Sequence, residues 1–420
     1  MHSNLRFFSN RYLRLLLVAI AVAFCVWAIR STAAFGLSRL YVKYALVNRS
    51  MGAATEATTL TPADAQAQIT AATISSLEGS TAQTLAAVEK AVALRPADYS
   101  LWIALGLTRD QLGDTSGALA AFDQAVKRAP LYSQPYWQRG NLLLRAGQYE
   151  SAFKDLNYAA QSNPELIPRL IDLAWGLSQG DAALTESMAQ IKSPKRRIAF
   201  ARLLVREGKA EEAVTQWKAA GELGGDIQRD LVRELLGKRS YKEAHTIWRA
   251  GRDTNASEPF EDGGFEGPLM LSEEAFGWRV PSDLKGVNLT LDATDRHSGT
   301  ASILATFQGE SAWSSALLSQ LALVEPSGHY KLNFAARSKD IVSGGPPIVV
   351  VTDPSDGKVL GKSIPLNKGT ASWQVFSVEF MTSPRTSAVT VSVQRESCTT
   401  SPCPIFGSLS LDSFSLERLK

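Results

Sequence analysis

The spacing of apolar positions changes twice along the chain. A first run, LRLLLVAIAVAFCVWAI from Leu13 to Ile29, is apolar at every position except Arg14. From residue 61 to residue 251, apolar residues recur every three or four positions, which is the period of an amphipathic helix. From about residue 260 they alternate with polar or small residues, which is the period of a half-buried strand. The pattern predicts a multidomain chain: an apolar helix, an all-α region and an all-β region.

The apolar run predicts a transmembrane anchor over residues 13–30, after a cytoplasmic tail of residues 1–12. The apolar run itself, Leu13 to Ile29, is 17 residues long. This is the short limit for a spanning helix, because about 20 residues are typical. Ser31-Thr32-Ala33 is a fair small-residue cleavage site, so a cleaved signal peptide is the competing interpretation. A buried core helix is a third. We expect a single-pass membrane protein whose juxtamembrane segment and linker occupy residues 31–60.

The cysteines decide the expected side of the membrane. Basic residues lie both before and after the apolar run, so the positive-inside rule fixes no orientation. Cys398 and Cys403 form CTTSPC with no histidine nearby, whereas a zinc site needs four ligands. A disulfide is favoured over two free thiols and implies an oxidising compartment. The bulk of the chain is therefore expected to be extracytoplasmic, in the periplasm, with the anchor in the inner (cytoplasmic) membrane.

A repeat of 34 residues runs through the helical region. Pro96, Pro130 and Pro164 are each 34 positions apart, and small and large apolar residues recur between them at fixed offsets. The resulting order resembles the tetratricopeptide pattern, with Arg109 where the family has Tyr. The resemblance implies a solenoid of paired helices over residues 61–251. The matching residues are Trp102, Leu105, Gly106, Ala118, Phe122, Ala125 and Pro130.

In tetratricopeptide proteins, one face of each first helix lines a concave surface that binds protein partners. The matching positions here imply an envelope protein partner held by this surface. A chaperone-tail clamp of that family is disfavoured, because Trp137 stands where a lysine is needed. Packing of Trp137 against the next repeat is the alternative to partner contact. The implied protein-binding residues are Asp110, Gln111, Trp137, Asn141 and Arg145.

The β region carries six short motifs in a family-like order. After a linker of residues 252–259, residues 260–420 resemble the jelly-roll carbohydrate-binding modules of the galactose-binding-like type. The resemblance implies an all-β jelly-roll sandwich. The motifs are GGFE at residues 263–266, Gly277-Trp278, His297-Ser298-Gly299, Gln320 before a strand, WQVF at residues 373–376 and LDSFSL at residues 411–416.

In those modules, the acid after the glycines and the aspartate of the last strand commonly hold a structural calcium. Glu266 and Asp412 match them, and a solvated turn carboxylate is the alternative for Glu266. The apolar residues of the last strand also change from odd positions, Leu409 and Leu411, to even positions, Phe414 and Leu416. This shift in the alternation predicts a β-bulge at Asp412 or Ser413. Such a bulge would re-aim the aspartate side chain.

Sugar binding by such modules uses an exposed aromatic ring and a few polar groups. Trp313 has small polar neighbours in GESAWSSA, and Trp373 could reach the rim of the sheet. Gln320 and Arg337 are candidate partners for sugar hydroxyls, with a core or sheet-edge hydrogen bond as the alternative for each.

Charge and motifs limit the function classes. The 420 residues carry 44 basic and 41 acidic side chains, and no basic run is interleaved with aromatics, so nucleic acid is a poor partner. No carboxylate pair suggests a glycosidase, and we expect a non-enzymatic protein. The predicted function is a membrane-anchored adaptor of the cell envelope that binds protein and polysaccharide, in exopolysaccharide assembly or export. The alternatives are a purely structural assembly factor and a glycan-active enzyme.

Overall fold

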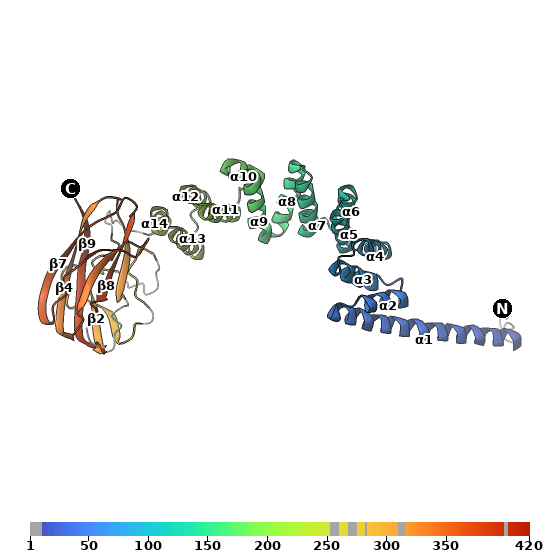
Figure 1. Ribbon diagram of the computed structural model, residues 1–420, viewed down its shortest axis with the longest axis horizontal. Helices are drawn as coiled ribbons and strands as arrows, with labels where there is room; N and C mark the ends of the chain where they lie inside the picture. Colours follow the sequence, from blue (N-terminus) through green and yellow to red (C-terminus); the bar gives the residue numbers. More distant parts are fainter. Residues whose placement is uncertain (1–10, 253–259, 268–274, 282–283, 310–315, 399–401) are drawn as a thin grey trace, which may run out of the picture. The chain divides into compact units, whose positions relative to one another are not determined.

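The computed structural model describes residues 11–252, 260–267, 275–281, 284–309, 316–398 and 402–420 (Figure 1). The chain divides into two compact units, Met1–Gln190 and Ile191–Lys420. The first unit is helical, and the second contains further helices followed by a β-sandwich. A helical region followed by an all-β region is the order that the sequence predicts.

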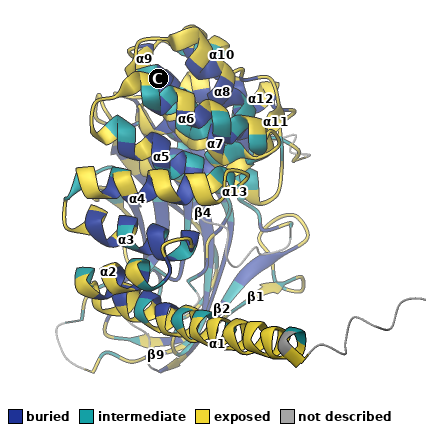
Figure 2. Cartoon of the chain, turned by 90° about the vertical axis from the view of Figure 1, so that its right-hand side faces the viewer, coloured by how far each residue is buried: buried dark blue, intermediate teal, exposed yellow. Residues whose placement is uncertain are grey.

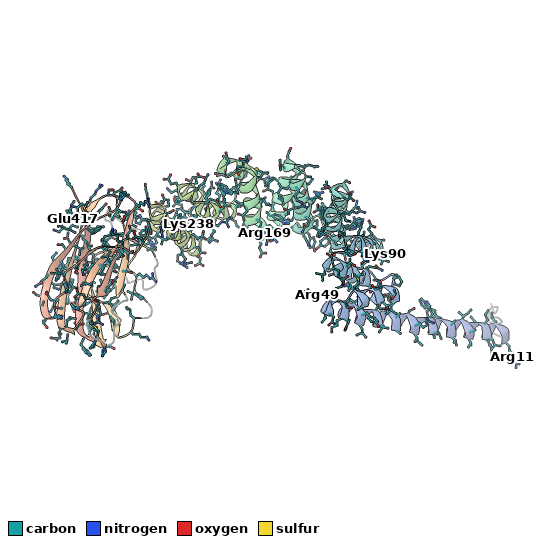
Figure 3. All side chains as sticks on the ribbon, in the orientation of Figure 1. Arg11, Arg49, Lys90, Arg169, Lys238 and Glu417 are labelled. Atoms are coloured by element: carbon teal, nitrogen blue, oxygen red, sulfur yellow. A yellow bond between two sulfur atoms is a disulfide. The ribbon has the colours of Figure 1, made fainter. Side chains whose placement is uncertain are left out.

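Helix α1 (Arg11–Asn48) is longer than the predicted anchor and continues without a break to Asn48, within the segment predicted as juxtamembrane and linker, residues 31–60. From Leu13 on, the helix is long and apolar enough to cross a membrane. A signal sequence meets the same criteria of length and composition. Figure 2 shows the visible side of the first part of this helix coloured mostly as exposed, and Figure 3 shows its side chains projecting from the ribbon.

The last third of α1 belongs to the packed helical unit. Ser38 donates a hydrogen bond to the Ala57 carbonyl, at 3.1 Å, and Arg39 pairs with the buried carboxylate of Asp64 at 3.3 Å. Val42 is buried against α2 and α3, whose caps are Ser50 and Asp64. The segment is therefore a structural helix of this unit and not a linker. The other helices of the unit are α2 (Met51–Leu60), α3 (Ala65–Leu77), α4 (Thr81–Leu94), α5 (Tyr99–Gln111), α6 (Thr115–Arg128), α7 (Ser133–Arg145), α8 (Tyr149–Ser162), the 3₁₀ turn η1 (Pro164–Leu166), α9 (Ile167–Leu177) and α10 (Ala182–Met188).

The 34-residue repeat corresponds to helix pairs. Each repeat proline directly follows the C-cap residue of a second helix, where proline's missing N–H costs nothing. A Cβ on Gly106 would lie 2.5 Å from the Phe122 ring, and one on Gly140 would lie 2.8 Å from Leu156. These glycines are 34 residues apart and let paired helices approach closely. The second unit continues with α11 (Pro194–Arg206), α12 (Ala210–Ala219), α13 (Asp226–Gly237) and α14 (Tyr241–Arg249).

The β region is a sandwich of two antiparallel sheets. One sheet has the order β1-β2-β9-β4-β7 and the other the order β3-β8-β5-β6. Alternate residues of both sheets, such as Phe334 and Val391, form one buried core between them. The jelly-roll assignment stays a prediction. The strands are β1 (Val287–Asp292), β2 (Ser302–Gly309), β3 (Leu318–Leu323), β4 (His329–Ser343), β5 (Pro347–Thr352), β6 (Val359–Lys362), β7 (Gly369–Met381), β8 (Ala388–Arg395) and β9 (Ile405–Leu419).

The predicted bulge in the last strand is confirmed. Asn333 of β4 lies opposite Ser415, but Ala335 lies opposite Asp412, so β9 has one extra residue. Ser413 takes up the irregularity with a left-handed φ of 56°. The bulge therefore sets the direction in which Asp412 extends from β9.

Candidate functional site

Two carboxylates hold the loop between β1 and β2, residues 293–301, which we name the β1–β2 loop. Asp412 is fully buried, and its Oδ2 accepts hydrogen bonds from the backbone N–H groups of His297 (2.8 Å) and Ser298 (2.9 Å). Glu266 accepts from the Thr300 N–H at 2.8 Å and from the Thr300 hydroxyl. Charge-assisted bonds of this kind are stronger than neutral ones, so the two carboxylates fix the second half of the loop, residues 297–300.

Two glycines allow these carboxylates to approach the loop and each other. Gly299 has a φ of +60°, and a Cβ there would lie 1.6 Å from Glu266 Oε1. A Cβ on Gly264 would lie 3.3 Å from Glu266 Oε1 and 3.9 Å from Asp412 Oδ1. The structure thus brings the two predicted calcium ligands near each other, both next to the Cβ position of Gly264. Among the described residues, no group of three Asp, Glu, His or Cys side chains is close enough to hold a metal ion.

The GGFE turn is built around Asp262, which the sequence interpretation did not single out. Its carboxylate accepts hydrogen bonds from the N–H groups of Glu266 (2.6 Å) and Gly267 (3.0 Å), and its carbonyl accepts from the Trp278 indole N–H (2.9 Å). Burial raises the pKa of Asp262, and the two backbone N–H groups oppose that shift. The turn places Phe265, which is fully buried, against Trp278 with ring centroids 5.0 Å apart. It therefore fixes both a core aromatic and the Glu266 carboxylate.

A polar cluster joins two of the predicted glycan-binding residues. The Trp373 indole N–H donates to Asp295 Oδ1 at 3.0 Å, and the Arg337 guanidinium pairs with Asp295 Oδ2. The His297 ring lies 5.8 Å from the Trp373 ring, and its Nδ1 is 3.0 Å from the Ser413 hydroxyl. We name Asp295, His297, Arg337 and Trp373 the Asp295 cluster. Trp373 and Arg337 are each partly exposed.

Sequence reasoning missed Asp295, although the spacing in DATDRHSG places it next to the His297 motif. Its two partners lie on β4 and β7, in the five-stranded sheet, and no local pattern links them to the β1–β2 loop. The structure therefore adds Asp295 and His297 to the candidate site.

The assignment of Gln320 to a glycan surface is wrong. Gln320 is 1% exposed, and its amide N–H₂ donates to the carbonyls of Glu261 (2.7 Å) and Phe276 (2.6 Å). The side chain thus satisfies backbone groups inside the sandwich, which is the alternative that the sequence left open. Trp313 lies outside the described residues.

The predicted protein-binding residues lie on α5 and α7. Trp137, Asn141 and Arg145 follow one another at four-residue spacing along α7, and the Asn141 amide donates to the Trp137 carbonyl at 2.7 Å. Arg145 forms an ion pair with Asp110 of α5. Trp137 is partly buried, so part of its side chain packs within the protein and the rest is accessible to a partner. Gln111 is exposed at the end of α5.

The predicted disulfide between Cys398 and Cys403 is present. Cys25 is an exposed free cysteine on α1.

Comparison with known proteins supports the helical part. A tetratricopeptide repeat family model matches residues 78–133 and 103–166. A search of curated proteins finds no match. Residues 78–166 therefore contain tetratricopeptide repeats, and an all-β region follows them in the chain.

Three solved structures are similar to parts of this chain. The MamA protein has 13% identity and a TM-score of 0.31, covering 51% of this chain and 96% of its own. YrrB, a TPR protein with an unusual peptide-binding site, has 19% identity and a TM-score of 0.26, covering 47% and 90%. A CBM4 structure has 12% identity and a TM-score of 0.29, covering 38% and 99%. At these values the likenesses carry no functional argument.

Replacement of Asp412 by Asn should destabilise the sandwich. The substitution removes the negative charge that strengthens the bonds from His297 and Ser298. It also places an N–H₂ group where the site needs an acceptor. We therefore expect a loss of about 2 kcal/mol in unfolding free energy. Urea unfolding followed by tryptophan fluorescence measures it. The matched control is Asp356→Asn. That carboxylate is exposed, and among the described residues it accepts one backbone N–H, from Lys358. Equal stability of both variants would contradict the clamp.

Proposed function

We propose that this protein is a non-enzymatic scaffold that binds a protein partner through the concave face of its helical repeats. The observation that carries the proposal is the tetratricopeptide repeat region at residues 78–166, a fold whose known role is protein–protein interaction. The face proposed for binding comprises Asp110 and Gln111 of α5 and Trp137, Asn141 and Arg145 of α7.

The contacts on this face favour a partner with an apolar anchor. Arg145 is already paired with Asp110, so its charge is largely balanced within the protein. Trp137 supplies an aromatic ring, and Asn141 has its amide engaged by the Trp137 carbonyl. Buried aromatic residues dominate the affinity of many interfaces. We therefore expect a partner that inserts an apolar side chain beside Trp137, and not an acidic tail that needs a free cation.

Replacement of Trp137 by Ala should weaken partner capture at least about tenfold, because an interface aromatic commonly contributes about 2 kcal/mol or more. The measurement is co-purification of envelope proteins with the full chain in detergent, quantified for wild type and variant. The control is Tyr149→Ala on α8, an aromatic of 49% exposure outside this face.

Circular dichroism of both variants separates binding from folding. Unchanged helix content with lost capture supports the proposed face. Loss of helix content in Trp137→Ala would instead identify Trp137 as a packing residue between repeats, and capture equal to that of Tyr149→Ala would remove it from the interface.

The proposed setting is the cell envelope. An exposed apolar helix of spanning length at the N-terminus and a disulfide in the β region support a single-pass protein of the inner membrane with its bulk in the periplasm. Exopolysaccharide assembly or export is the proposed process. A purely structural assembly factor is the alternative when the sandwich binds no sugar.

A second candidate function, glycan binding, is favoured by the Asp295 cluster. An indole ring can stack on a pyranose face, while a guanidinium, a carboxylate and an imidazole bond to hydroxyls. Trp373 and Arg337 are partly exposed and held in place by Asp295, so the cluster is organised without a ligand. A preorganised site binds with a smaller entropy cost. We therefore place the proposed sugar site on the outer side of β4 and β7.

Replacement of Trp373 by Ala should lower glycan affinity at least about tenfold, because the stacking surface is lost. Binding of the full chain to an array of neutral and acidic polysaccharides measures it. The control is Met381→Ala, which removes a side chain of 68% exposure at the far end of β7. An array on which the unmutated chain binds nothing would favour the structural alternative.

A calcium ion at Glu266 and Asp412 is also proposed. The two carboxylates both lie next to the Cβ position of Gly264, and they are hard oxygen ligands of the kind that calcium prefers. Both already accept backbone N–H groups, so the ion would use their remaining lone pairs together with carbonyl oxygens or water. Its chemistry there would be structural, as a counter-charge to the two carboxylates.

Removal of calcium by a chelator should lower the melting temperature of the sandwich, because an ion that binds only the folded state stabilises it by mass action. Differential scanning calorimetry with added calcium and with chelator measures the difference. Glu266→Gln should remove the difference while leaving the Asp412 bonds to His297 and Ser298 in place. A melting temperature that is indifferent to chelator would exclude the ion.

A further inference from the structure

Arg395, at the end of β8, is a buried cation in contact with the disulfide. The residue is 2% exposed. Its guanidinium donates to the Gly345 carbonyl, in the turn between β4 and β5, at 3.1 Å and to the hydroxyl of Ser343, the last residue of β4, at 3.0 Å. It also lies 3.0 Å from Cys403 Sγ and donates to the Cys403 carbonyl at 2.9 Å. The guanidinium therefore connects β8 with the start of β9 and with the end of β4.

The two sulfur atoms of the disulfide have different surroundings. Cys403 Sγ faces the Arg395 guanidinium. Cys398 Sγ instead lies against the glycines of the β4–β5 turn, since a Cβ added to Gly344 or Gly345 would be 3.2 or 3.0 Å from it. Both cysteines are partly exposed. Among the described residues, a cation contacts Cys403 Sγ directly and no such contact is found for Cys398 Sγ, so opening of the bond leaves Cys403 beside the Arg395 guanidinium.

A neighbouring cation favours the thiolate form of a cysteine and lowers its pKa. Burial lowers the pKa of Arg395, which means that the buried guanidinium gains from an anion placed beside it. A thiol with a lowered pKa is also the better leaving group in thiol–disulfide exchange. The arrangement thus stabilises the reduced state of the pair at Cys403.

We propose that Cys398 and Cys403 form an exchangeable disulfide, in which Cys398 is the sulfur attacked by an external dithiol and Cys403 is the leaving group held by Arg395. This site is separate from the helical face and from the Asp295 cluster, and it does not rest on the function proposed for either.

The exchange balances in two steps. A thiolate of the external dithiol attacks Cys398 Sγ, the Cys398–Cys403 bond breaks, and its electron pair passes to Cys403 Sγ, which leaves as a thiolate beside Arg395. The second thiolate of the dithiol then attacks the external sulfur of the mixed disulfide and releases Cys398 as a thiolate. The dithiol is oxidised by two electrons, and the protein disulfide is reduced by two.

The fold can survive the opening of this bond. The cysteines are separated by 5 positions, and a short loop gives a disulfide its smallest entropic contribution to stability. The backbone on either side is held independently: Glu396 N–H donates to the Pro346 carbonyl, and Ile405 pairs with Ser343 in the sheet. Arg395 adds hydrogen bonds to the Ser343 hydroxyl and the Cys403 carbonyl that do not require the disulfide.

The test compares the two thiols in the same full-length protein in detergent. With Cys25→Ser as background, Cys398→Ser leaves Cys403 as the only thiol, and Cys403→Ser leaves Cys398. The rate of alkylation by iodoacetamide is followed against pH by mass spectrometry, for the folded chain and in urea. We expect the inflection of Cys403 in the folded chain to lie at least about one pH unit below that in urea, a tenfold larger thiolate-to-thiol ratio. Cys398 should show no such lowering.

Two further measurements complete the test. Arg395→Lys should retain the lowered inflection of Cys403, and Arg395→Gln should lose it; if Arg395→Gln does not fold, the comparison of Cys403 with Cys398 decides. In the Cys25→Ser chain, reduction by dithiothreitol should leave the circular dichroism of the sandwich intact, and oxidised dithiothreitol should restore the bond. A Cys403 inflection equal to that of Cys398, or unfolding of the sandwich on reduction, would overturn the proposal.

Discussion

The arrangement of the sandwich surface depends on the hydrogen bonds that the buried carboxylate of Asp412 accepts from the β1–β2 loop. A fully buried carboxylate is costly unless hydrogen bonds replace its water, and the N–H groups of His297 and Ser298 do so here. The carboxylate can reach them because the bulge at Ser413 changes its direction. In return the β1–β2 loop has one preferred position, and that position places Asp295 against Arg337 and Trp373. The surface cluster is thus a consequence of a buried bond.

The same loop connects the beginning and the end of the β region. Glu266 comes from the first turn and Asp412 from the last strand, and both hold residues 297–300. Beneath them the aromatic rings of Phe265 and Phe414 each pack against Trp278. Polar bonds above and aromatic packing below therefore close the sandwich at one place. A structural cation would reinforce this closure, whereas the hydrogen bonds already provide it in part.

The sequence alone predicted those features that produce a regular repeat or a local change in the alternation of apolar residues. The 34-residue spacing predicts the helix pairs, and the parity change between Leu411 and Phe414 predicts the bulge. It was insufficient for contacts between side chains far apart in the chain. Asp295 meets Trp373 across 78 positions, and Gln320 is a core residue because it satisfies the Glu261 carbonyl 59 positions away. Neither contact leaves a repeating pattern, because each depends on how strands from different parts of the chain are placed.

The continuity of α1 follows from the same distinction. Composition changes near residue 30, so the sequence divides there into an anchor and a linker. No proline lies between residue 30 and Asn48, however, and the helix continues through Gly36 and Ser38. Ser38 and Arg39 then tie its last third to α2 and α3. A helix rises about 1.5 Å per residue and bends little over one or two turns. If residues 13–30 cross a membrane as proposed, the packed helical unit begins about two turns beyond the span, at Ser38, and the anchor and the first packed segment of the scaffold are one helix.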